Sequence, residues 1–216
     1  MKKSAIIFAA FFCLHTLHAQ QQSGRITFER VINIHENLKP DQLQFKDMIP
    51  ETVTDEIILS FNGEYAKVVM PGINTRESDT GQAHTSITTG SADDLARYID
   101  PSSNSVYILQ ESTNGKQKLR QQQYDESRDA KRFQPGEKTK VILGFTCKQV
   151  MLKTKEVNFT LWVTDQLPFK GGLIEVYCPY GAVLACESVK WRCIAKDIKY
   201  EAVHQEEVAI PKALVK

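Results

Sequence analysis

Residues Glu56 to Pro71 read EIILSFNGEYAKVVMP, and this stretch decides the fold class. It consists of two apolar runs on either side of Asn62-Gly63. That dipeptide accepts positive φ at both central positions of a type I′ turn, a tight connection between antiparallel strands. The sequence therefore predicts a β-hairpin centred on Asn62-Gly63, in which Leu59 lies opposite Ala66 on one face of the sheet.

The same alternation of apolar and polar residues recurs along most of the chain. Near the N-terminal end, Ile26 and Phe28 alternate with Thr27 and Glu29, as in a half-buried strand. Further short segments of this kind are found at 95–99, 105–110, 116–123, 140–153, 157–164, 173–178, 182–192 and 198–203. Short strands separated by turns predict an all-β fold, mainly antiparallel: a meander, an open half-barrel or a sandwich, with few short helical turns.

Three segments do not follow the strand pattern. Residues 39–50 predict one or two helical turns or an ordered loop. Residues 72–92 are polar and rich in Gly, Ser and Thr, which predicts a long loop. Residues 125–136 are charged, and we interpret them as a solvated loop.

The N-terminal end has the pattern of an export signal. Lys2 and Lys3 precede the apolar run AIIFAAFFCL at residues 5–14, and Ala19 supplies a small residue at the expected cleavage site. A membrane span needs about 20 apolar residues, and this run is shorter. We therefore expect residues 1–19 to be a signal peptide and 20–216 to form a single β-rich domain that is exported to the periplasm, to the outer membrane or out of the cell.

The charge balance of the mature chain is close to neutral. The sequence has 27 Lys and Arg against 26 Asp and Glu, and two of the lysines belong to the signal. Nucleic-acid binding favours a strong basic excess, so we expect no nucleic-acid partner. No later apolar run approaches membrane length, so we also expect no transmembrane segment after processing.

Four of the five cysteines lie in the C-terminal third of the chain, at Cys147, Cys178, Cys186 and Cys193. An even number of cysteines in an exported chain predicts two disulfides that staple this region. Spacing leaves three pairings open. A mild preference goes to Cys178–Cys186, which flank a Pro-Tyr-Gly turn, and Cys147 would then pair with Cys193.

The sequence contains no recognisable catalytic, cofactor-binding or metal-binding motif. His35, His84 and His204 are not spaced as metal ligands, and no Gly-x-Ser-x-Gly nucleophile motif is present. The expectation is a protein without catalytic residues, cofactor or metal. If it were nevertheless a hydrolase, Asp165 and Glu175 would be its most plausible acidic groups.

Two other sequence patterns are compatible either with a structural role or with a binding site. Aromatic residues gather around the cysteines, where they either fill the core or line an apolar groove; they are Phe145, Phe159, Trp162, Phe169, Tyr177, Tyr180 and Trp191. Lys116, Lys118 and Arg120 alternate along one predicted strand, which is typical of a solvated face and less often of an anion site.

Residues Ile142 to Tyr177 read ILGFTCKQVMLKTKEVNFTLWVTDQLPFKGGLIEVY. This stretch resembles the GLPGLI family, which comprises exported β-rich proteins of Gram-negative bacteria. The similarity lies in Gly144-Phe145-Thr146-Cys147-Lys148, in Leu161-Trp162-Val163-Thr164-Asp165 with Pro168, and in Gly171-Gly172-Leu173-Ile174-Glu175-Val176. The naming motif differs, because Lys170-Gly171-Gly172 replaces Gly-Leu-Pro-Gly.

The resemblance implies an exported β-rich fold and no particular chemistry. In physical terms, Gly171-Gly172 permits positive φ or a close backbone approach before an apolar segment. Asp165 follows a strand end and is placed to cap the next turn. We therefore expect Gly144, Trp162, Pro168 and these three residues to have structural roles.

These observations lead to three hypotheses. The first is a non-enzymatic envelope protein that binds an apolar small molecule, a lipid or another envelope protein on a sheet face. The second is a carrier or chaperone for a lipid or lipoprotein, with a half-barrel around a cavity. The third is a hydrolase, which would require two carboxylates about 5–10 Å apart in a cleft.

Overall fold

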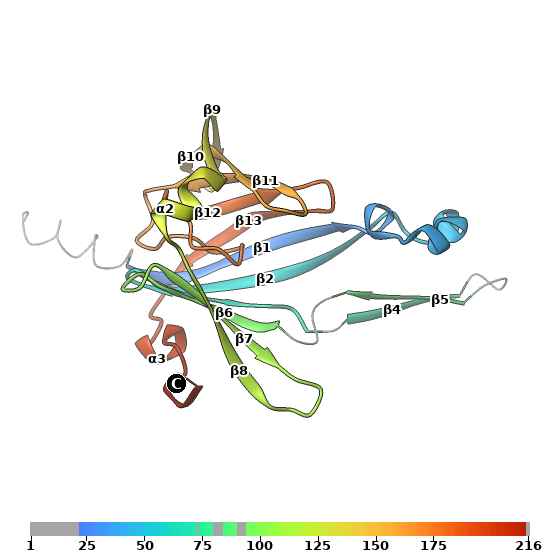
Figure 1. Ribbon diagram of the computed structural model, residues 1–216, viewed down its shortest axis with the longest axis horizontal. Helices are drawn as coiled ribbons and strands as arrows, with labels where there is room; N and C mark the ends of the chain where they lie inside the picture. The colour runs from blue at the N-terminus through green and yellow to red at the C-terminus, as the bar shows by residue number, and fades with distance from the viewer. Residues whose placement is uncertain (1–21, 73, 80–83, 90–93, 215–216) are drawn as a thin grey trace, which may run out of the picture.

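The computed structural model describes residues 22–72, 74–79, 84–89 and 94–214. Most of these residues form one 11-stranded sheet in which every neighbouring pair is antiparallel (Figure 1). Its strands are β1 (Ser23–Asn33), β2 (Thr52–Asn62), β3 (Tyr65–Val69), β6 (Asp94–Asp100), β7 (Ser105–Glu111), β8 (Gln117–Gln123), β9 (Phe133–Ile142), β10 (Phe145–Lys153), β11 (Asn158–Thr164), β12 (Ala182–Glu187) and β13 (Trp191–Tyr200). This confirms the prediction of an all-β antiparallel fold with few short helices.

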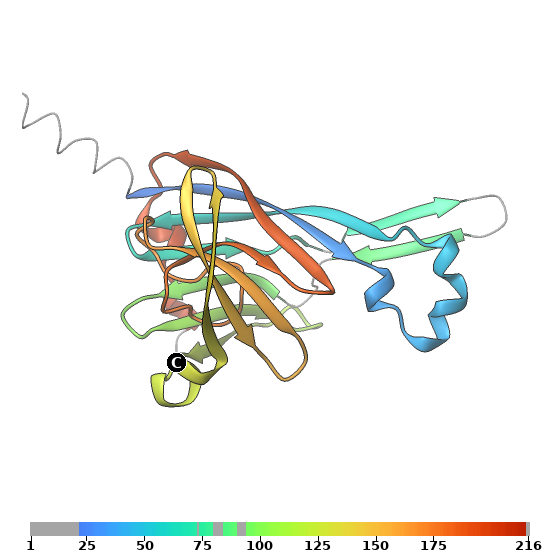
Figure 2. The ribbon, with the colours of Figure 1, turned by 90° about the horizontal axis from the view of Figure 1, so that it is seen from above.

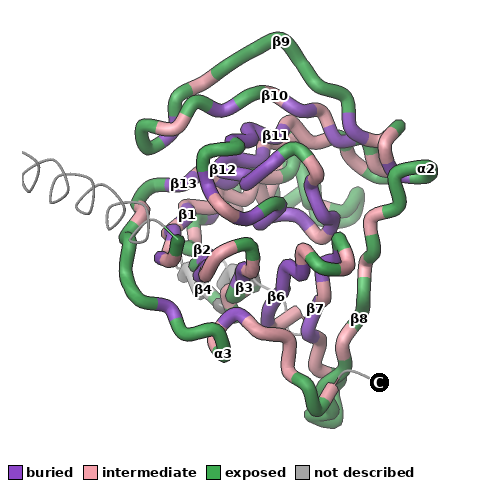
Figure 3. Tube along the Cα trace, turned by 90° about the vertical axis from the view of Figure 1, so that its left-hand side faces the viewer, coloured by how far each residue is buried: buried purple, intermediate pink, exposed green. Residues whose placement is uncertain are grey.

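The sheet is a meander that curves round without closing. Its strand order is β8-β7-β6-β3-β2-β1-β13-β12-β11-β10-β9, so the two edge strands are consecutive in the sequence. Figure 3 shows the strands following this curve, with β9 and β8 at its two ends. The structure is therefore a meander that forms an open half-barrel, and the third alternative, a sandwich, is not what the chain forms.

The connection between the two edges is short and partly helical. It contains α2 (Glu126–Asp129) and the 3-10 turn η3 (Ala130–Arg132), and Phe133 already begins β9. The prediction of a solvated loop at 125–136 is thus wrong, because this segment carries the chain across the opening of the half-barrel. The edge strand β9 contains Pro135, which lacks the N–H that a further paired strand would require.

The β2–β3 hairpin exists, but its turn is displaced from the predicted position. Asn62 pairs with Tyr65, so the two loop residues are Gly63 and Glu64, and Leu59 lies opposite Val68 instead of Ala66. Of the two loop residues only Gly63 has positive φ, at 57°. Glycine at the first loop position is the requirement of a type II′ turn, which explains why the pairing moved by two residues while the same face stayed buried.

The core lies between the concave face of the sheet and the long connection from β11 to β12. Residues 165–181 of this connection cross the inside of the curve, and an isolated parallel bridge joins Gly171 to Ala182. Its apolar side chains, including Phe169, Leu173 and Ile174, are buried. The prediction of a regular strand at 173–178 is wrong, since this segment packs into the core without joining the sheet ladder.

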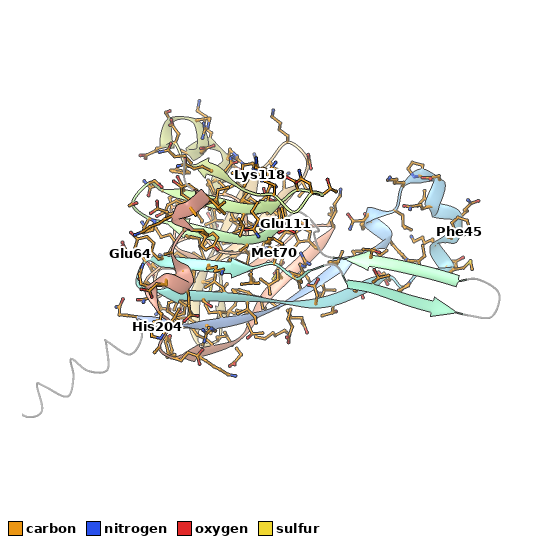
Figure 4. The ribbon with its side chains drawn as sticks, turned by 90° about the horizontal axis from the view of Figure 1, so that it is seen from below. Phe45, Glu64, Met70, Glu111, Lys118 and His204 are labelled. Carbon is orange, nitrogen blue, oxygen red and sulfur yellow. The ribbon has the colours of Figure 1, made fainter. Side chains whose placement is uncertain are left out.

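An arm extends from one end of the half-barrel (Figure 2). The long strands β1 and β2 lead into it, and between them lie η1 (His35–Asn37) and η2 (Pro40–Met48). The helical turns predicted for residues 39–50 correspond to η2, whereas η1 was not predicted. Residues 72–92 were expected to be a loop, but they contain β4 (Asn74–Asp79) and β5 (His84–Thr89), which pair as a separate two-stranded sheet. Phe45 is exposed on this arm (Figure 4).

The C-terminal residues cover part of the outer face of the sheet. They include α3 (Gln205–Val208) and η4 (Lys212–Leu214), and Ile210 and Leu214 pack on Ala96 and Tyr98 of β6. Within the described ranges, none of the helices has the length and hydropathy that a membrane crossing demands. The predicted signal peptide at 1–19 lies outside the described residues.

Candidate functional site

A cavity of about 410 Å³ opens on the concave side of the half-barrel. This volume lies within the range of about 300–1,000 Å³ that is common for small-molecule sites. Its apolar wall is formed by Ile57, Met70, Leu152, Phe159, Leu173, Ile174, Val176 and Trp191. Its polar side chains are Arg30, Arg97, Gln122, Arg132, Thr154 and Glu175. We call this cavity the concave pocket.

The pocket combines inward-facing strand residues with the crossing segment. Leu173, Ile174 and Val176 of that segment form its base and are buried. Phe159 on β11 and Trp191 on β13 contact each other with tilted rings, their centroids 5.6 Å apart at an interplanar angle of 51°, and contribute an aromatic side. Met70, at the end of β3 (Figure 4), supplies a flexible thioether that adapts to the shape of a neighbour.

Arg97 is the most deeply buried charge in the pocket. Its Nη1 donates to the carbonyl oxygen of Leu173 at 3.0 Å, and its Nη2 lies 3.3 Å from Glu175 and 3.7 Å from Asp94. Its Nε is buried and has no hydrogen-bond partner among the residues that the structure describes. Burial lowers the pKa of the Arg97 guanidinium, although the carboxylates of Glu175 and Asp94 act in the opposite direction. An arginine keeps its charge in such a setting, so the pocket contains a buried cation with one unused donor.

Glu175 forms a bridge between two arginines. One carboxylate oxygen faces Arg97, and the other accepts a hydrogen bond of 2.8 Å from Arg120 on β8. The Glu175 side chain is 41% exposed, in contrast to 11% for Arg97. The crossing segment thus presents a carboxylate at the mouth of the pocket, where it contacts both a buried and an exposed guanidinium.

The other two pocket arginines have closer partners. Arg30 binds Asp55 through two hydrogen bonds, of 2.8 and 2.6 Å, in the bidentate geometry that favours strong pairing. Arg132 donates to Asp129 at 3.1 Å. Burial would raise the pKa of Asp129, but the hydrogen bonds from Arg128, Arg132 and the backbone N–H of Asp125 outweigh it and lower the pKa to about 2.

The carboxylates proposed for a hydrolase do not meet in one cavity. Glu175 lines the concave pocket, whereas Asp165 lines a separate cavity of about 170 Å³ beside Pro135 and Tyr180. The part of the chain that the structure describes contains no cluster of three or more His, Cys, Asp or Glu residues arranged to hold a metal ion. Asp165 and Glu175 therefore do not line one cleft together, as the hydrolase hypothesis requires.

The motif residues that the sequence singled out are dispersed. Gly144 lies in the β9–β10 turn and Pro168 is half-buried in the crossing segment. Trp162 is buried on β11, and its Nε1 donates to Glu187 at 3.1 Å. Gly171 and Gly172 have φ values of 90° and 134°, as their predicted role in a turn requires.

Asp165 does not cap the turn after β11. Its side chain is exposed and makes no hydrogen bond to any residue that the structure describes. The capping contacts come from its neighbours: the hydroxyl of Thr164 accepts from the backbone N–H of Gln166, and the Gln166 side chain accepts from the backbone N–H of Thr146 at 3.0 Å. The capping role predicted for Asp165 is therefore wrong.

All four candidate cysteines are buried and carry free thiols, so the two expected disulfides are not formed in this structure. Cys186 on β12 and Cys193 on β13 are direct cross-strand partners, which differs from the favoured pairing of Cys178 with Cys186. Burial raises the pKa of Cys178 and Cys193 to about 12 and that of Cys147 to about 11. Disulfide stapling stays a prediction, and Cys186–Cys193 is the pair that the fold places side by side.

The sequence left open a core role or a groove role for the aromatic residues, and both occur, although Tyr180 is 43% exposed and lies in neither the core nor the concave pocket. Phe159 and Trp191 line the concave pocket, while Phe169 and Tyr177 are buried in the core. Sequence reasoning missed Arg97. A signal for it existed, since a single arginine interrupts the apolar run from Leu95 to Ile99.

Comparisons with known proteins support the fold and no more. No protein-family model matches the chain, and no curated protein matches it. The structure is similar to two crystal forms of PNGF-II, in space groups C2 and P21, both with a TM-score of 0.55, at 17% and 16% sequence identity. The matches cover 87% of this chain but only 29% and 30% of the PNGF-II chains. They show a shared fold and leave the GLPGLI resemblance as a prediction.

Proposed function

We propose that this protein is a non-enzymatic binding protein of the bacterial envelope that holds an apolar or amphipathic small molecule in the concave pocket. The observation that carries the proposal is the pocket itself: about 410 Å³, with eight apolar side chains and a few convergent polar groups. That combination is characteristic of ligand sites. It favours the carrier hypothesis, in which a half-barrel surrounds a lipid-like molecule.

The route into the pocket is consistent with this role. Strands β8 and β9 do not pair, and Gln122 of β8 and Arg132 of the connecting segment both line the cavity. A ligand would enter beside this unpaired edge, where the polar side chains lie, and place its apolar part against Phe159 and Trp191.

The proposal is tested with N-phenyl-1-naphthylamine, a neutral apolar dye whose fluorescence increases when it binds in an apolar site that excludes water. We expect the protein to bind the dye and Gln122→Trp to raise its Kd about tenfold, because overfilling a packed site costs about 1–3 kcal/mol and 1.4 kcal/mol is a factor of ten. Gln123→Trp is the matched control, since neighbouring strand residues face opposite sides and Gln123 is exposed. Equal dye binding by both variants would contradict the proposal.

Binding of another envelope protein remains a second candidate. The observation in its favour is the arm, where Leu43, Phe45 and Met48 are 53%, 49% and 39% exposed. Exposed apolar residues at the end of a projection are typical of contact surfaces. Phe45→Ser separates the two roles: it should leave dye binding unchanged if the arm serves a partner alone.

A further inference from the structure

The charges that line the concave pocket are not balanced among themselves. Three guanidinium groups, from Arg30, Arg97 and Arg132, face a single carboxylate, that of Glu175. Arg30 is matched by its bidentate contact with Asp55, and Arg132 by Asp129. Arg97 differs from both, because its two ionic contacts are 3.3 and 3.7 Å long. Charge-assisted hydrogen bonds usually measure about 2.7–2.9 Å.

Resting on the proposed function, we infer that the ligand is an anionic amphiphile whose acid group binds Arg97 in the place of the Glu175 carboxylate. The buried Nε of Arg97, which has no partner within the described part of the chain, supplies a further donor for an oxyanion. A guanidinium offers parallel N–H groups that match the two oxygens of a carboxylate or phosphate. The apolar part of the ligand would then extend over the side chains that share the cavity with Arg97.

Glu175 is suited to give way to such a ligand. It lies in the irregular crossing segment, its side chain is 41% exposed, and its contact with Arg120 is the shorter of its two. Glu175 can therefore release Arg97 and keep the 2.8 Å hydrogen bond to Arg120. The exchange replaces one carboxylate by another acid group, so the buried charge of Arg97 stays compensated throughout.

The position of Arg97 relative to the apolar wall explains why an amphiphile fits better than a small anion. Its Nη1 contacts the backbone of Leu173, whose side chain lines the pocket together with Ile174 and Val176. An acid group at Arg97 would therefore lie directly beside buried apolar surface. A free inorganic anion would leave that surface unused, whereas an alkyl chain would bury against it and gain free energy in proportion to the apolar area covered.

The test is displacement of N-phenyl-1-naphthylamine by four compounds with the same ten-carbon chain: decanoate, decyl phosphate, decanol and decyltrimethylammonium. At neutral pH we expect the two anions to displace the dye at concentrations about tenfold or more below that of decanol, as one charged hydrogen bond of about 1.5–3 kcal/mol implies. The order of decanoate and decyl phosphate distinguishes a fatty-acid-like from a phospholipid-like head group. The cation should be the weakest of the four.

The decisive variant is Glu175→Gln. Removal of the competing carboxylate should lower the displacing concentration of both anions about tenfold and leave decanol unchanged. Glu64→Gln, in the distant β2–β3 turn (Figure 4), removes the same charge away from the pocket and should change neither. Arg97→Gln should abolish the preference for anions over decanol, provided that its circular-dichroism spectrum and melting curve show a folded protein.

The outcomes separate this inference from the function on which it rests. If neither the dye nor decanol binds, the proposed function itself fails. If both bind, but the anions show no advantage or Glu175→Gln weakens them, the inference alone is overturned. Preference for the cation, lost in Glu175→Gln, would show that Glu175 and not Arg97 is the recognition group.

Discussion

Replacement of Gly181 by alanine should be among the most damaging single-methyl changes in this protein. Gly181 immediately precedes β12 and has a φ of 136°, which side chains of L-residues rarely tolerate. A Cβ built on it would lie 2.2 Å from the carbonyl oxygen of Thr164 and 2.8 Å from its carbonyl carbon. Both atoms belong to the backbone of the last residue of β11, so no side-chain rotation can relieve the contact.

The expected cost follows from two contributions. A non-glycine residue in a sparsely populated backbone region costs about 1–3 kcal/mol. The backbone clash adds to this, and relief would require β11 and β12 to separate where Thr164 pairs with Ala182. We therefore expect Gly181→Ala to lower the free energy of unfolding by more than about 3 kcal/mol, a loss large enough to require a specific structural cause.

Gly115→Ala is the matched control. Gly115 also has positive φ, at 75°, but an added Cβ would meet no atom within 4 Å. Its cost should be that of the backbone conformation alone, about 1–2 kcal/mol. Urea denaturation of both variants beside the parent measures the difference, with the slope checked for equality. Equal losses for the two variants would refute the claim that the approach of Thr164 makes Gly181 indispensable.

Four further predictions concern other parts of the molecule. Gly172→Val should cost on the order of 1–3 kcal/mol in urea denaturation, because φ is 134° and a Cβ would lie 3.3 Å from Leu59. Asp165→Ala should lie within about 0.5 kcal/mol of the parent in the same assay, as expected for an exposed side chain without a hydrogen-bond partner among the described residues. Folding lowers the pKa of Asp129 from 3.8 to about 2, so its contribution to stability is complete above about pH 4 and is lost as the pH falls towards 2. Between about pH 4 and about pH 2 the urea midpoint of the parent should therefore fall more than that of Asp129→Asn. Mild oxidation should form a disulfide between Cys186 and Cys193, which lie opposite each other on antiparallel strands. Such residues have Cα separations of about 4.5–5.5 Å, within the range for disulfides. Peptide mapping that found Cys178 joined to Cys186 would contradict this.

Period-two alternation identified most strands because each buries one face against the core. It misassigned Leu173 to Cys178, where an apolar run crosses the inside of the sheet and is buried without strand pairing. Such a run has the same composition as a buried strand, and only the curvature of the whole sheet creates the space that it fills. The order of the strands was equally inaccessible, because it depends on the pairing of β1 with β13 from opposite ends of the chain.

The candidate site was harder to predict than the fold for a related reason. Its wall combines residues of β1, β2, β6, β8, β10, β11 and β13 with the crossing segment. These residues are spread along the chain and do not form a recognisable sequence motif. Glu175 was identified as a candidate acid, but its partners Arg97 and Arg120 lie far from it in the sequence. The local signal that did exist, one arginine inside an apolar strand, indicates a buried charge without indicating what neutralises it.

The opening of the half-barrel connects stability to the shape of the pocket. Because β8 and β9 do not pair, the segment between them is held by other contacts, and the buried Asp129 accepts hydrogen bonds from Arg128, Arg132 and the backbone N–H of Asp125. Arg132 also lines the pocket. The carboxylate that fixes the connection therefore also fixes one wall of the site. Loss of its charge should loosen the pocket as well as the fold, whereas a ligand that binds only the folded protein should stabilise it by RT ln(1 + [L]/Kd).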